Sequence, residues 1–93
     1  MERVEVEVTV TIINALGLHA RAAAQLVKVA NAHPCEVEVV CEGQAVNGKS
    51  IMGVLMLAAA QGMQVTLRCS GERSKQCCDE LVALIGNRFG EPR

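Results

Sequence analysis

Hydrophobic and polar residues alternate in three stretches of the chain. Between residues 4 and 12 the apolar side chains occupy the even positions, and residues 36–41 and 64–69 alternate in the same way. A period of two is typical of a β-strand with one buried and one solvated face. The dipeptide Glu42-Gly43 predicts a hairpin turn, because its glycine supplies a positive φ, and a short returning strand over residues 44–47. The pattern therefore predicts four strands.

A helix is predicted directly after the first strand. From Ala20 onward apolar side chains recur at helical spacing, and the pattern ends near Ala32 because Pro34 cannot continue a helix. We interpret His33 as an exposed turn residue. The change of period falls just before Ala20, which places His19 at or next to the helix N-cap.

Two further helices follow. Residues 51–60 come after Ser50, a preferred N-cap residue, and their methionine, leucine and alanine content favours a helix over a buried strand. This helix is expected to end at Gln61-Gly62. Ser74 is predicted to cap a final helix that runs to Phe89, and the last four residues are predicted to be a tail.

The order strand, helix, strand, strand, helix, strand, helix predicts the layers of the fold. A sheet with one solvated face must pack its helices on the other face. The 93 residues suffice for one domain, and 51% of them are hydrophobic, although Phe89 is the single aromatic residue. We therefore expect one α+β domain over residues 1–93, in which an antiparallel sheet lies beneath three helices around an aliphatic core.

The predicted helix over residues 51–60 is apolar on every side, whereas a core helix needs only one apolar stripe. One consistent inward stripe consists of Val54, Leu57 and Ala58. The apolar residues that then point outward near the start of the helix are Ile51, Met52 and Leu55. An exposed apolar patch marks a partner surface, unless the helix is sandwiched and fully buried.

Charge and hydropathy argue against several classes of function. The net charge is −1, and no cluster of lysine and arginine exceeds two residues, so the chain lacks both a basic footprint and an aromatic stacking platform for nucleic acid. No apolar run approaches the roughly 18 residues of a membrane-spanning helix, and the first five residues lack the apolar run of a signal peptide. We expect a cytoplasmic protein that does not insert into membranes.

The five cysteines predict neither disulfides nor a metal site. An odd number without a secretion signal argues against a disulfide framework, and no C-x-x-C pair or zinc-ligand spacing occurs. Four of the five are interpreted as small buried hydrophobes. No metal and no cofactor are expected, and the sequence has no acid–base pair that would make the chain an enzyme by itself. The cysteines are Cys35, Cys41, Cys69, Cys77 and Cys78.

The predicted start of the first helix suits a reactive histidine. The first backbone N–H groups of a helix have no intrahelical partner, and together with the helix dipole they attract anions such as phosphate. A neutral imidazole nitrogen is a nucleophile, and Arg21 carries a planar set of donors that fits phosphate oxygens. We hypothesise that His19 accepts a phosphoryl group, which Arg21 and the N–H groups of residues 20–22 hold. In the alternative, His19 only caps the helix and Arg21 is a solvated charge.

Two stretches of the chain resemble the signatures of a known family. Residues 14–23 (NALGLHARAA) resemble the phosphorylation-site signature of HPr, the histidine phosphocarrier of the bacterial phosphotransferase system. Residues 47–55 (NGKSIMGVL) resemble the second signature of that family, around its regulatory serine, and the 31 positions from His19 to Ser50 also fit. The similarity covers nearly the whole chain, so two motifs at the right separation support the phosphocarrier hypothesis together.

The resemblance implies a fold and a relay. The fold would be an open-faced β-sandwich with sheet order 1-4-2-3. His19 would receive a phosphoryl group on Nδ1 from enzyme I, which phosphoenolpyruvate charges, and would pass it to an enzyme IIA-type protein. Ser50 would be the target of an ATP-dependent HPr kinase/phosphorylase. The apolar docking patch would be made of Ala20, Ile51, Met52 and Leu55. Separately from the resemblance, we expect the chain to be a monomer.

One position departs from the family pattern. Proline usually follows the arginine, whereas this chain has Ala22. Alanine is a good helix former and restores an N–H donor close to the phosphate, so phosphorylation is expected to survive. The departure leaves open whether the carrier serves sugar uptake or a regulatory or nitrogen-type system.

Two other hypotheses stay open at this point. The chain could be a regulatory binding module of a nitrogen-type or carbon-control phosphotransferase system, acting mainly through phosphorylated Ser50. It could instead be a small metal-binding or ligand-sensing domain with a similar order of elements. Ser50 could also serve only as a helix cap.

Overall fold

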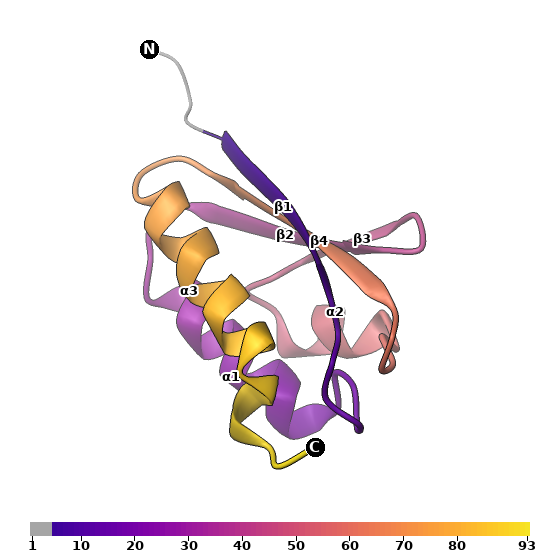
Figure 1. The fold of residues 1–93 in the computed structure, drawn as a ribbon. Coiled ribbons are helices and arrows are strands. Elements are labelled where there is room, and N and C mark those ends of the chain that lie inside the picture. The colour runs from indigo at the N-terminus through magenta and orange to yellow at the C-terminus, as the bar shows by residue number, and fades with distance from the viewer. Residues whose placement is uncertain (1–4) are drawn as a thin grey trace.

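A computed structural model describes residues 5–93, which form a four-stranded sheet and three helices (Figure 1). Val4, the first residue of the predicted first strand, lies outside the described residues. The strands are β1 (Glu5–Thr11), β2 (Glu36–Cys41), β3 (Gln44–Asn47) and β4 (Gln64–Ser70). The helices are α1 (Ala20–Asn31), α2 (Ile51–Met56) and α3 (Ser74–Gly86), followed by a single 3₁₀ turn, η1 (Arg88–Gly90).

The strands lie in the order β1-β4-β2-β3, and every neighbouring pair is antiparallel. Figure 1 shows α1, α2 and α3 together on one side of the sheet, while the other side carries no helix. This arrangement confirms the predicted α+β class, the 1-4-2-3 order and the layer of three helices. The hairpin between β2 and β3 also turns at the predicted dipeptide, because both Glu42 and Gly43 have a positive φ.

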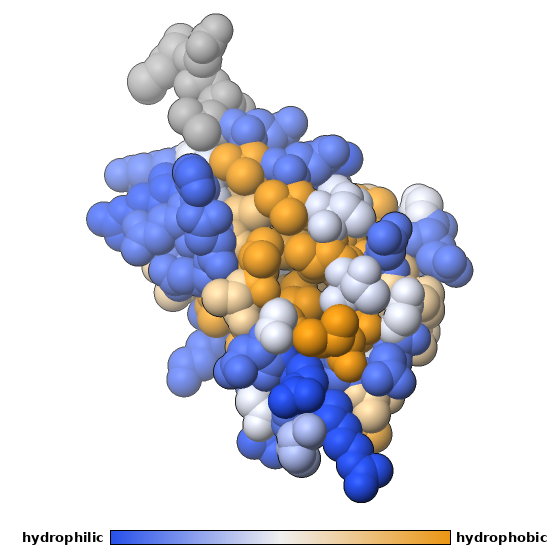
Figure 2. Space-filling model, viewed as in Figure 1, coloured by the Kyte–Doolittle hydropathy of each residue, from blue (hydrophilic) through white to orange (hydrophobic). Residues whose placement is uncertain are grey.

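The core lies between the sheet and the helices and is almost entirely aliphatic. The two inner strands, β2 and β4, bury alternate residues under the helices. β1 is an edge strand, so its valines at positions 6, 8 and 10 are only half-buried. Figure 2 shows the resulting apolar band, which follows β1 across the surface. Phe89 is 2% exposed and packs in the same core.

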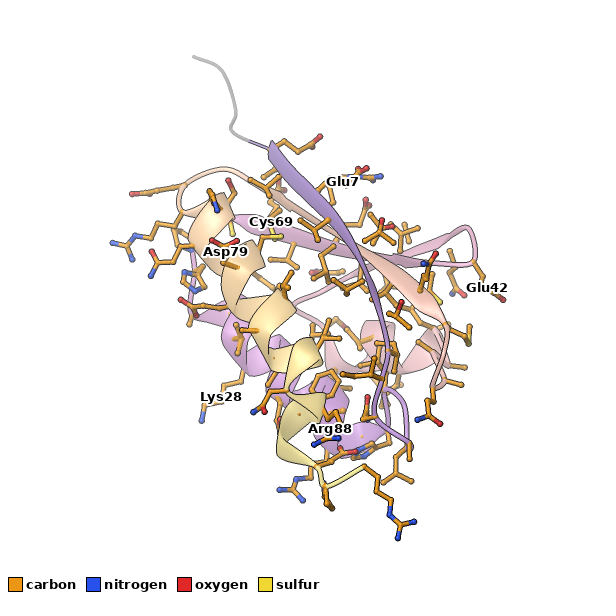
Figure 3. All side chains as sticks on the ribbon, viewed as in Figure 1. Glu7, Lys28, Glu42, Cys69, Asp79 and Arg88 are labelled. Carbon is orange, nitrogen blue, oxygen red and sulfur yellow. The ribbon has the colours of Figure 1, made fainter. Side chains whose placement is uncertain are left out.

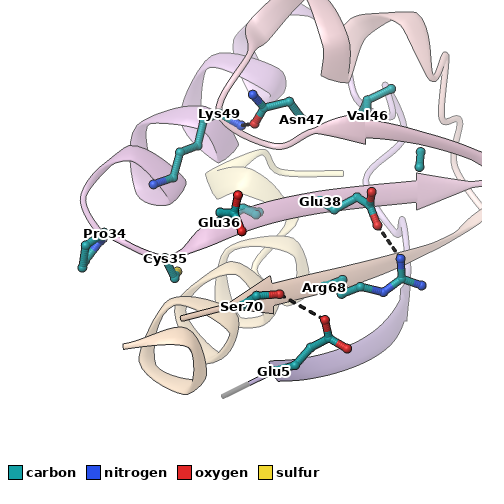
Figure 4. A pocket seen from close by; sticks show the side chains of 12 residues that line it. Glu5, Pro34, Cys35, Glu36, Glu38, Val46, Asn47, Lys49, Arg68 and Ser70 are labelled. Carbon is teal, nitrogen blue, oxygen red and sulfur yellow. Dashed lines mark hydrogen bonds and ion pairs between the residues drawn. The ribbon is translucent and has the colours of Figure 1, made fainter. Parts of the chain in front are cut away.

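Polar pairs cross the open face of the sheet. Arg68 on β4 donates to Glu7 on β1 over 2.8 Å and also to Glu38 on β2, so one guanidinium joins three strands. At one end of this face, a polar hollow of about 560 Å³ is lined by Glu5 and Ser70, whose hydroxyl donates to the Glu5 carboxylate over 3.1 Å (Figure 4). These exposed pairs fix the register of the strands more than they stabilise the fold.

The second helix is shorter than predicted. α2 ends at Met56 instead of near residue 60, because Ala58 adopts a left-handed φ of 50° that a helix cannot continue. The chain turns there so that the carbonyl of Ala59 accepts a hydrogen bond from Leu18 over 2.8 Å. As a result Ala59 is buried and Ala58, predicted to face inward, is exposed. A tertiary hydrogen bond has overridden a local helix preference.

The ends of the third helix also differ from the prediction. Arg73, with a left-handed φ of 62°, precedes α3 and supplies no side-chain cap. Ser74 is therefore not the cap but the first residue of the helix, and its buried hydroxyl finds no hydrogen-bond partner among residues 5–93. At the other end α3 stops at Gly86 instead of continuing to Phe89, which has a φ of 54° and lies in the following 3₁₀ turn. This turn directs the aromatic ring into the core.

His33 is buried, although the sequence predicted an exposed turn residue. Its side chain is 6% exposed, and its Nε2 atom hydrogen-bonds Glu80 of α3 over 3.0 Å. The backbone carbonyl of His33 accepts from the ammonium group of Lys49 over 2.6 Å. The prediction was wrong because a turn after a helix is solvated only where no other element packs on it, and here α3 packs against α1.

All five cysteines are reduced and buried. The sequence predicted burial for four of them, and the structure shows it for the fifth as well. Cys69 on β4 lies on the helix side of the sheet, close to the start of α3 where Cys77 and Cys78 are found (Figure 3). Burial raises the pKa of the Cys69 thiol to about 12 and also raises that of Cys77.

Within residues 5–93 no group of three or more metal-ligating side chains is arranged to hold an ion. None of the helices in this range has the length and apolar character needed to cross a membrane.

Candidate functional site

The loop between β1 and α1 is held by backbone contacts on both sides. Asn14 is fully buried, and its amide donates to the Gly17 carbonyl over 2.8 Å while its own carbonyl accepts from the Gly17 N–H over 3.1 Å. Leu18 then donates to Ala59, in the segment after α2. Gly17 has a φ of 66°, and a Cβ atom there would lie 2.5 Å from the Ala59 oxygen. Only glycine therefore fits this close approach, which fixes where α1 begins.

His19 is the N-cap residue of α1, as predicted. Its backbone is extended (φ −74°, ψ 178°), and its Nδ1 atom accepts a hydrogen bond from the backbone N–H of Arg21 over 3.3 Å. An imidazole nitrogen that accepts carries a lone pair, so the ring proton resides on Nε2. The side chain is 28% exposed, which leaves the ring accessible from solvent. Nδ1 is thus an unprotonated nitrogen at the positive end of a helix.

The other ring nitrogen of His19 binds a residue that the sequence prediction missed. Nε2 donates to the Oε2 atom of Glu91 over 2.5 Å, and Asn14 donates to the Oε1 atom of the same carboxylate over 3.0 Å. Both hydrogen bonds lower the pKa of Glu91 from its usual value, and the one from His19 has the larger effect. The positive charge of Arg21 lowers this pKa as well. The last four residues are therefore not a free tail. Figure 1 shows the C-terminus beside the start of α1.

No sequence signal pointed to Glu91. It follows η1 in a stretch without hydrophobic periodicity, and 72 positions separate it from His19. Its placement depends on how α3 crosses the sheet and on the turn around Phe89, which direct the chain back to α1. A hydrogen bond from the Ala15 N–H to the Arg93 carbonyl over 3.1 Å fixes this return.

A cavity of about 430 Å³ opens next to His19. Its lining is Ala15, Leu16, His19, Arg21, Glu91, Pro92 and Arg93. The cavity therefore lies at the N-terminus of α1, and its lining includes the histidine together with two arginines, Arg21 and Arg93. Such a combination can receive an anionic group at Nδ1 and balance its charge.

Ser50 occupies the same position on α2 that His19 occupies on α1. It is the N-cap residue, and its hydroxyl accepts from the Gly53 N–H over 3.1 Å. The backbone is extended there, and the side chain is half-buried. The predicted cap is thus formed, and Ser50 directly precedes the exposed apolar residues Ile51 and Met52.

The predicted apolar patch is only partly as expected. Ile51 and Met52 are exposed, by 43% and 71%, and Ala20 is exposed in the first turn of α1. Leu55 is partly exposed and also packs against the core, so it contributes less surface than predicted. Leu16 and Met56 are 70% and 66% exposed, although the sequence analysis did not single them out. Leu16 could not be found from periodicity because it lies in a loop.

Three comparisons with known proteins bear on this site. The family model described as "PTS HPr component phosphorylation site" matches residues 6–87. The phosphocarrier protein HPr of Pseudomonas putida is 55% identical over 86 residues, which cover 88% of this chain and 92% of that protein. The crystal structure of HPr-C-His from Thermoanaerobacter tengcongensis has a TM-score of 0.91 and 40% identity, covering 95% of this chain and 99% of that one.

A second crystal structure from Thermoanaerobacter tengcongensis is described as an HPr dimer. It has a TM-score of 0.75 and 40% identity, and covers 90% of this chain and 97% of that one. The fold, the site around His19 and these comparisons agree with one another. The chain belongs to the HPr family of phosphocarrier proteins of the phosphotransferase system.

Proposed function

We propose that His19 accepts a phosphoryl group on Nδ1 from enzyme I and passes it to an enzyme IIA-type protein. The observation that carries the proposal is the position of Nδ1, an unprotonated nitrogen that faces the Arg21 N–H at the start of α1. Helix N-termini bind phosphate through such N–H groups. The partner proteins align the phosphoryl group for transfer, so this chain needs no general base of its own and acts only as a carrier.

The transfer balances without moving a proton at Nδ1. The Nδ1 lone pair attacks the phosphorus of the donor's phosphohistidine, an N–P bond forms, and the bond from phosphorus to the donor nitrogen breaks with its electron pair returning to the donor. The negative charge of the arriving group is balanced by the N-terminus of α1 and by Arg21, which lines the same cavity. Transfer to the acceptor protein is the same step in reverse.

Ser50 is the proposed site of regulatory phosphorylation by an HPr kinase/phosphorylase. A phosphate there adds nearly two negative charges at the N-terminus of α2, which the helix dipole tolerates. The same charges lie next to Ile51 and Met52, two exposed apolar residues. Phosphorylation therefore weakens docking of partners on this patch, because the dianion resists desolvation and repels acidic surfaces.

The partner surface is the exposed apolar region around the start of α2. It comprises Ala20, Ile51, Met52 and the accessible part of Leu55. A small patch is enough for a carrier that must release each partner after transfer. We place the carrier in the cytoplasm as a monomer, and light scattering after size-exclusion chromatography tests its oligomeric state. A stable dimer, as in the related Thermoanaerobacter structure, would contradict the monomer.

Labelling with enzyme I and phosphoenolpyruvate tests the proposed function. Intact-mass spectrometry should show the gain of one phosphate that mild acid removes. The His19→Ala variant should show no gain, whereas a His33→Gln variant should be labelled like the natural chain because His33 is buried. These are the two histidines of the chain, so the pair identifies the site. Labelling that persists in His19→Ala would contradict the proposal.

The alternative is a regulatory module that acts mainly through Ser50. A specific observation favours it, since Ser50 is next in the chain to Ile51 and Met52 of the exposed apolar patch. Under this hypothesis, kinase and ATP modify Ser50 and not the Ser50→Ala variant, while enzyme I leaves His19 unlabelled. Labelling of His19 at a rate typical of a carrier excludes the module as the main function.

A further inference from the structure

Glu91 and His19 form a carboxylate–imidazole pair that the family signature does not contain. We infer that Glu91 is a positioning residue for the phosphoryl transfer: it fixes the His19 ring in the tautomer whose Nδ1 atom is free to react. The inference rests on the proposed function of His19. It adds a residue from the far end of the chain and assigns it a role.

The geometry of the pair is tightly determined. Glu91 Oε2 lies 2.5 Å from His19 Nε2, and the Glu91 side chain is only 9% exposed. The second carboxylate oxygen is held by Asn14 over 3.0 Å. Asn14 is fully buried and uses the same amide nitrogen to donate to Gly17, so it cannot turn away. The acceptor of the Nε2 proton is thus itself anchored to the loop that begins α1.

This anchoring has a chemical consequence for the ring. A neutral imidazole carries one proton, and its two tautomers place it on Nδ1 or on Nε2. A carboxylate at Nε2 can only accept, so it selects the Nε2–H tautomer and leaves the lone pair on Nδ1. The Arg21 N–H, which needs an acceptor at Nδ1, favours the same tautomer from the other side. The two contacts also hold the ring plane of His19, which lines the cavity.

Glu91 also bears on the charge that develops during transfer. When the Nδ1 lone pair forms the bond to phosphorus, the ring acquires positive charge, and the proton remains on Nε2. The carboxylate faces that proton and stabilises the charge without removing it. When the phosphoryl group leaves, the electron pair returns to Nδ1 and the ring is again the neutral Nε2–H form. Glu91 stays a hydrogen-bond acceptor throughout and does not touch the phosphoryl group.

A second pair in the same chain provides the matched control. Glu80 accepts from Nε2 of His33 over 3.0 Å, in the same manner as Glu91 accepts from His19. His33 is buried and takes no part in the proposed transfer. A Glu80→Gln variant therefore removes a carboxylate from a histidine of this chain without changing the phosphorylation site. Its effect on transfer should be nil.

The experiment compares ring tautomers and transfer kinetics in three variants. Nitrogen-15 NMR of labelled histidines at mildly alkaline pH should report Nε2–H for His19 in the natural chain and in Glu80→Gln. It should report a mixture of tautomers in Glu91→Ala and a smaller change in Glu91→Gln, whose amide oxygen can still accept. The rate of phosphoryl transfer from enzyme I should fall by about 10-fold or more in Glu91→Ala, with little change in KM.

Each outcome decides the inference. If His19 keeps a single Nε2–H tautomer and an unchanged transfer rate in Glu91→Ala, Glu91 has no positioning role. If only KM rises, Glu91 acts in partner binding and the inference is wrong. If Glu91→Ala does not fold, Glu91→Gln and its NMR spectrum decide. Failure of the natural chain to be labelled at His19 would remove the proposed function, while the NMR comparison would still show whether Glu91 sets the tautomer.

Discussion

The two histidines of this chain form the same kind of bond in two different surroundings. Each donates from Nε2 to a glutamate, His19 over 2.5 Å and His33 over 3.0 Å. Their exposure differs, because the His19 side chain is 28% exposed and that of His33 is 6% exposed. The remaining nitrogen of His19 accepts a hydrogen bond from the Arg21 N–H at the start of α1, whereas Nδ1 of His33 is buried without a partner among residues 5–93. Exposure therefore distinguishes the histidine of the candidate site from the histidine that packs in the interior.

The pair of His33 and Glu80 predicts how stability depends on pH. The hydrogen bond from His33 lowers the pKa of Glu80 from its usual value. A lowered folded-state pKa stabilises the protein at pH above the ordinary glutamate value, and this contribution is lost as the pH falls through the lowered pKa. Glu80→Gln should therefore be less stable than the natural chain at neutral pH, with the gap closing in acid. Urea unfolding at about pH 7 and about pH 3 measures the difference in free energy of unfolding between the two proteins at each pH. A difference that is the same at both pH values would contradict this account.

Gly17 predicts a second effect at the residue scale. In Gly17→Ala the new Cβ meets the Ala59 oxygen at 2.5 Å and the residue must keep a left-handed φ. Strain and clash together should lower the free energy of unfolding by about 3 kcal/mol. Gly62→Ala is the matched control, because Gly62 has a φ of 90° and open space around its Cβ position. It should cost about 1 kcal/mol, from strain alone.

Urea unfolding of the two glycine variants separates clash from strain. If both variants lose equal stability, the contact with Ala59 contributes nothing. Gly17→Ala should also slow labelling of His19, because the loop that this glycine shapes leads directly into the N-cap of α1. Gly62→Ala should leave labelling unchanged.

At the residue scale, the local pattern predicted the position of His19 and not that of Glu91. A local change of hydrophobic period predicted where α1 begins, and this located His19 and Arg21 correctly. Glu91 and the buried position of His33 both depend on α3 and the segment after it, which approach α1 only in the folded molecule. Local patterns contain no information about such contacts between distant segments.

At the scale of elements, two serines near helix starts behave differently. Ser50 is the N-cap residue before α2, and Ser74 is the first residue of α3. The Ser50 hydroxyl accepts from Gly53 and caps α2, whereas the Ser74 hydroxyl is buried without a partner within the described residues. Ser50→Ala should lower the free energy of unfolding by about 1 kcal/mol. Ser74→Ala should be neutral or stabilising, because it removes a buried polar group whose hydrogen bond is not made. Equal losses in urea unfolding would contradict this distinction.

The ends of helices were predicted less well than their existence. α1 ends within one residue of the predicted position because Pro34 stops it locally. α2 and α3 end where tertiary contacts require a turn, at Ala58 and just before Phe89, and both of these residues adopt a left-handed φ. Neither is a glycine, so composition gave no warning. Packing of Phe89 and the Leu18–Ala59 hydrogen bond explain these ends.

At the scale of the whole molecule, the order and alternation of elements sufficed to predict the layers. A sheet with one polar face must gather its helices on the other, and the structure does so. The order of the strands came from the family resemblance and not from periodicity. Alternation shows which face of a strand is buried, but it does not say which strand lies beside which. Cross-strand groups such as Arg68 with Glu7 become visible only once that order is known.

The buried cysteines predict a property of the whole fold. All five thiols are 2% exposed or less, and burial raises the pKa of Cys69 and Cys77, so few thiolates are present and reagents cannot reach them. Ellman's reagent should therefore leave the native protein unmodified and should titrate five thiols in urea. A Met52→Cys variant is the control and should react at once in the native state, because Met52 is 71% exposed. Rapid reaction of the natural chain would contradict this burial.

The separation of 72 positions between His19 and Glu91 has a consequence for protein synthesis. While the ribosome is still adding those residues, the nascent chain already contains the histidine but has no carboxylate to hold its ring. The proposed phosphorylation site is complete only after Glu91 has emerged and α3 has packed against α1. A chain that stalls before position 91 would therefore carry the signature motif without the hydrogen bond between His19 and Glu91.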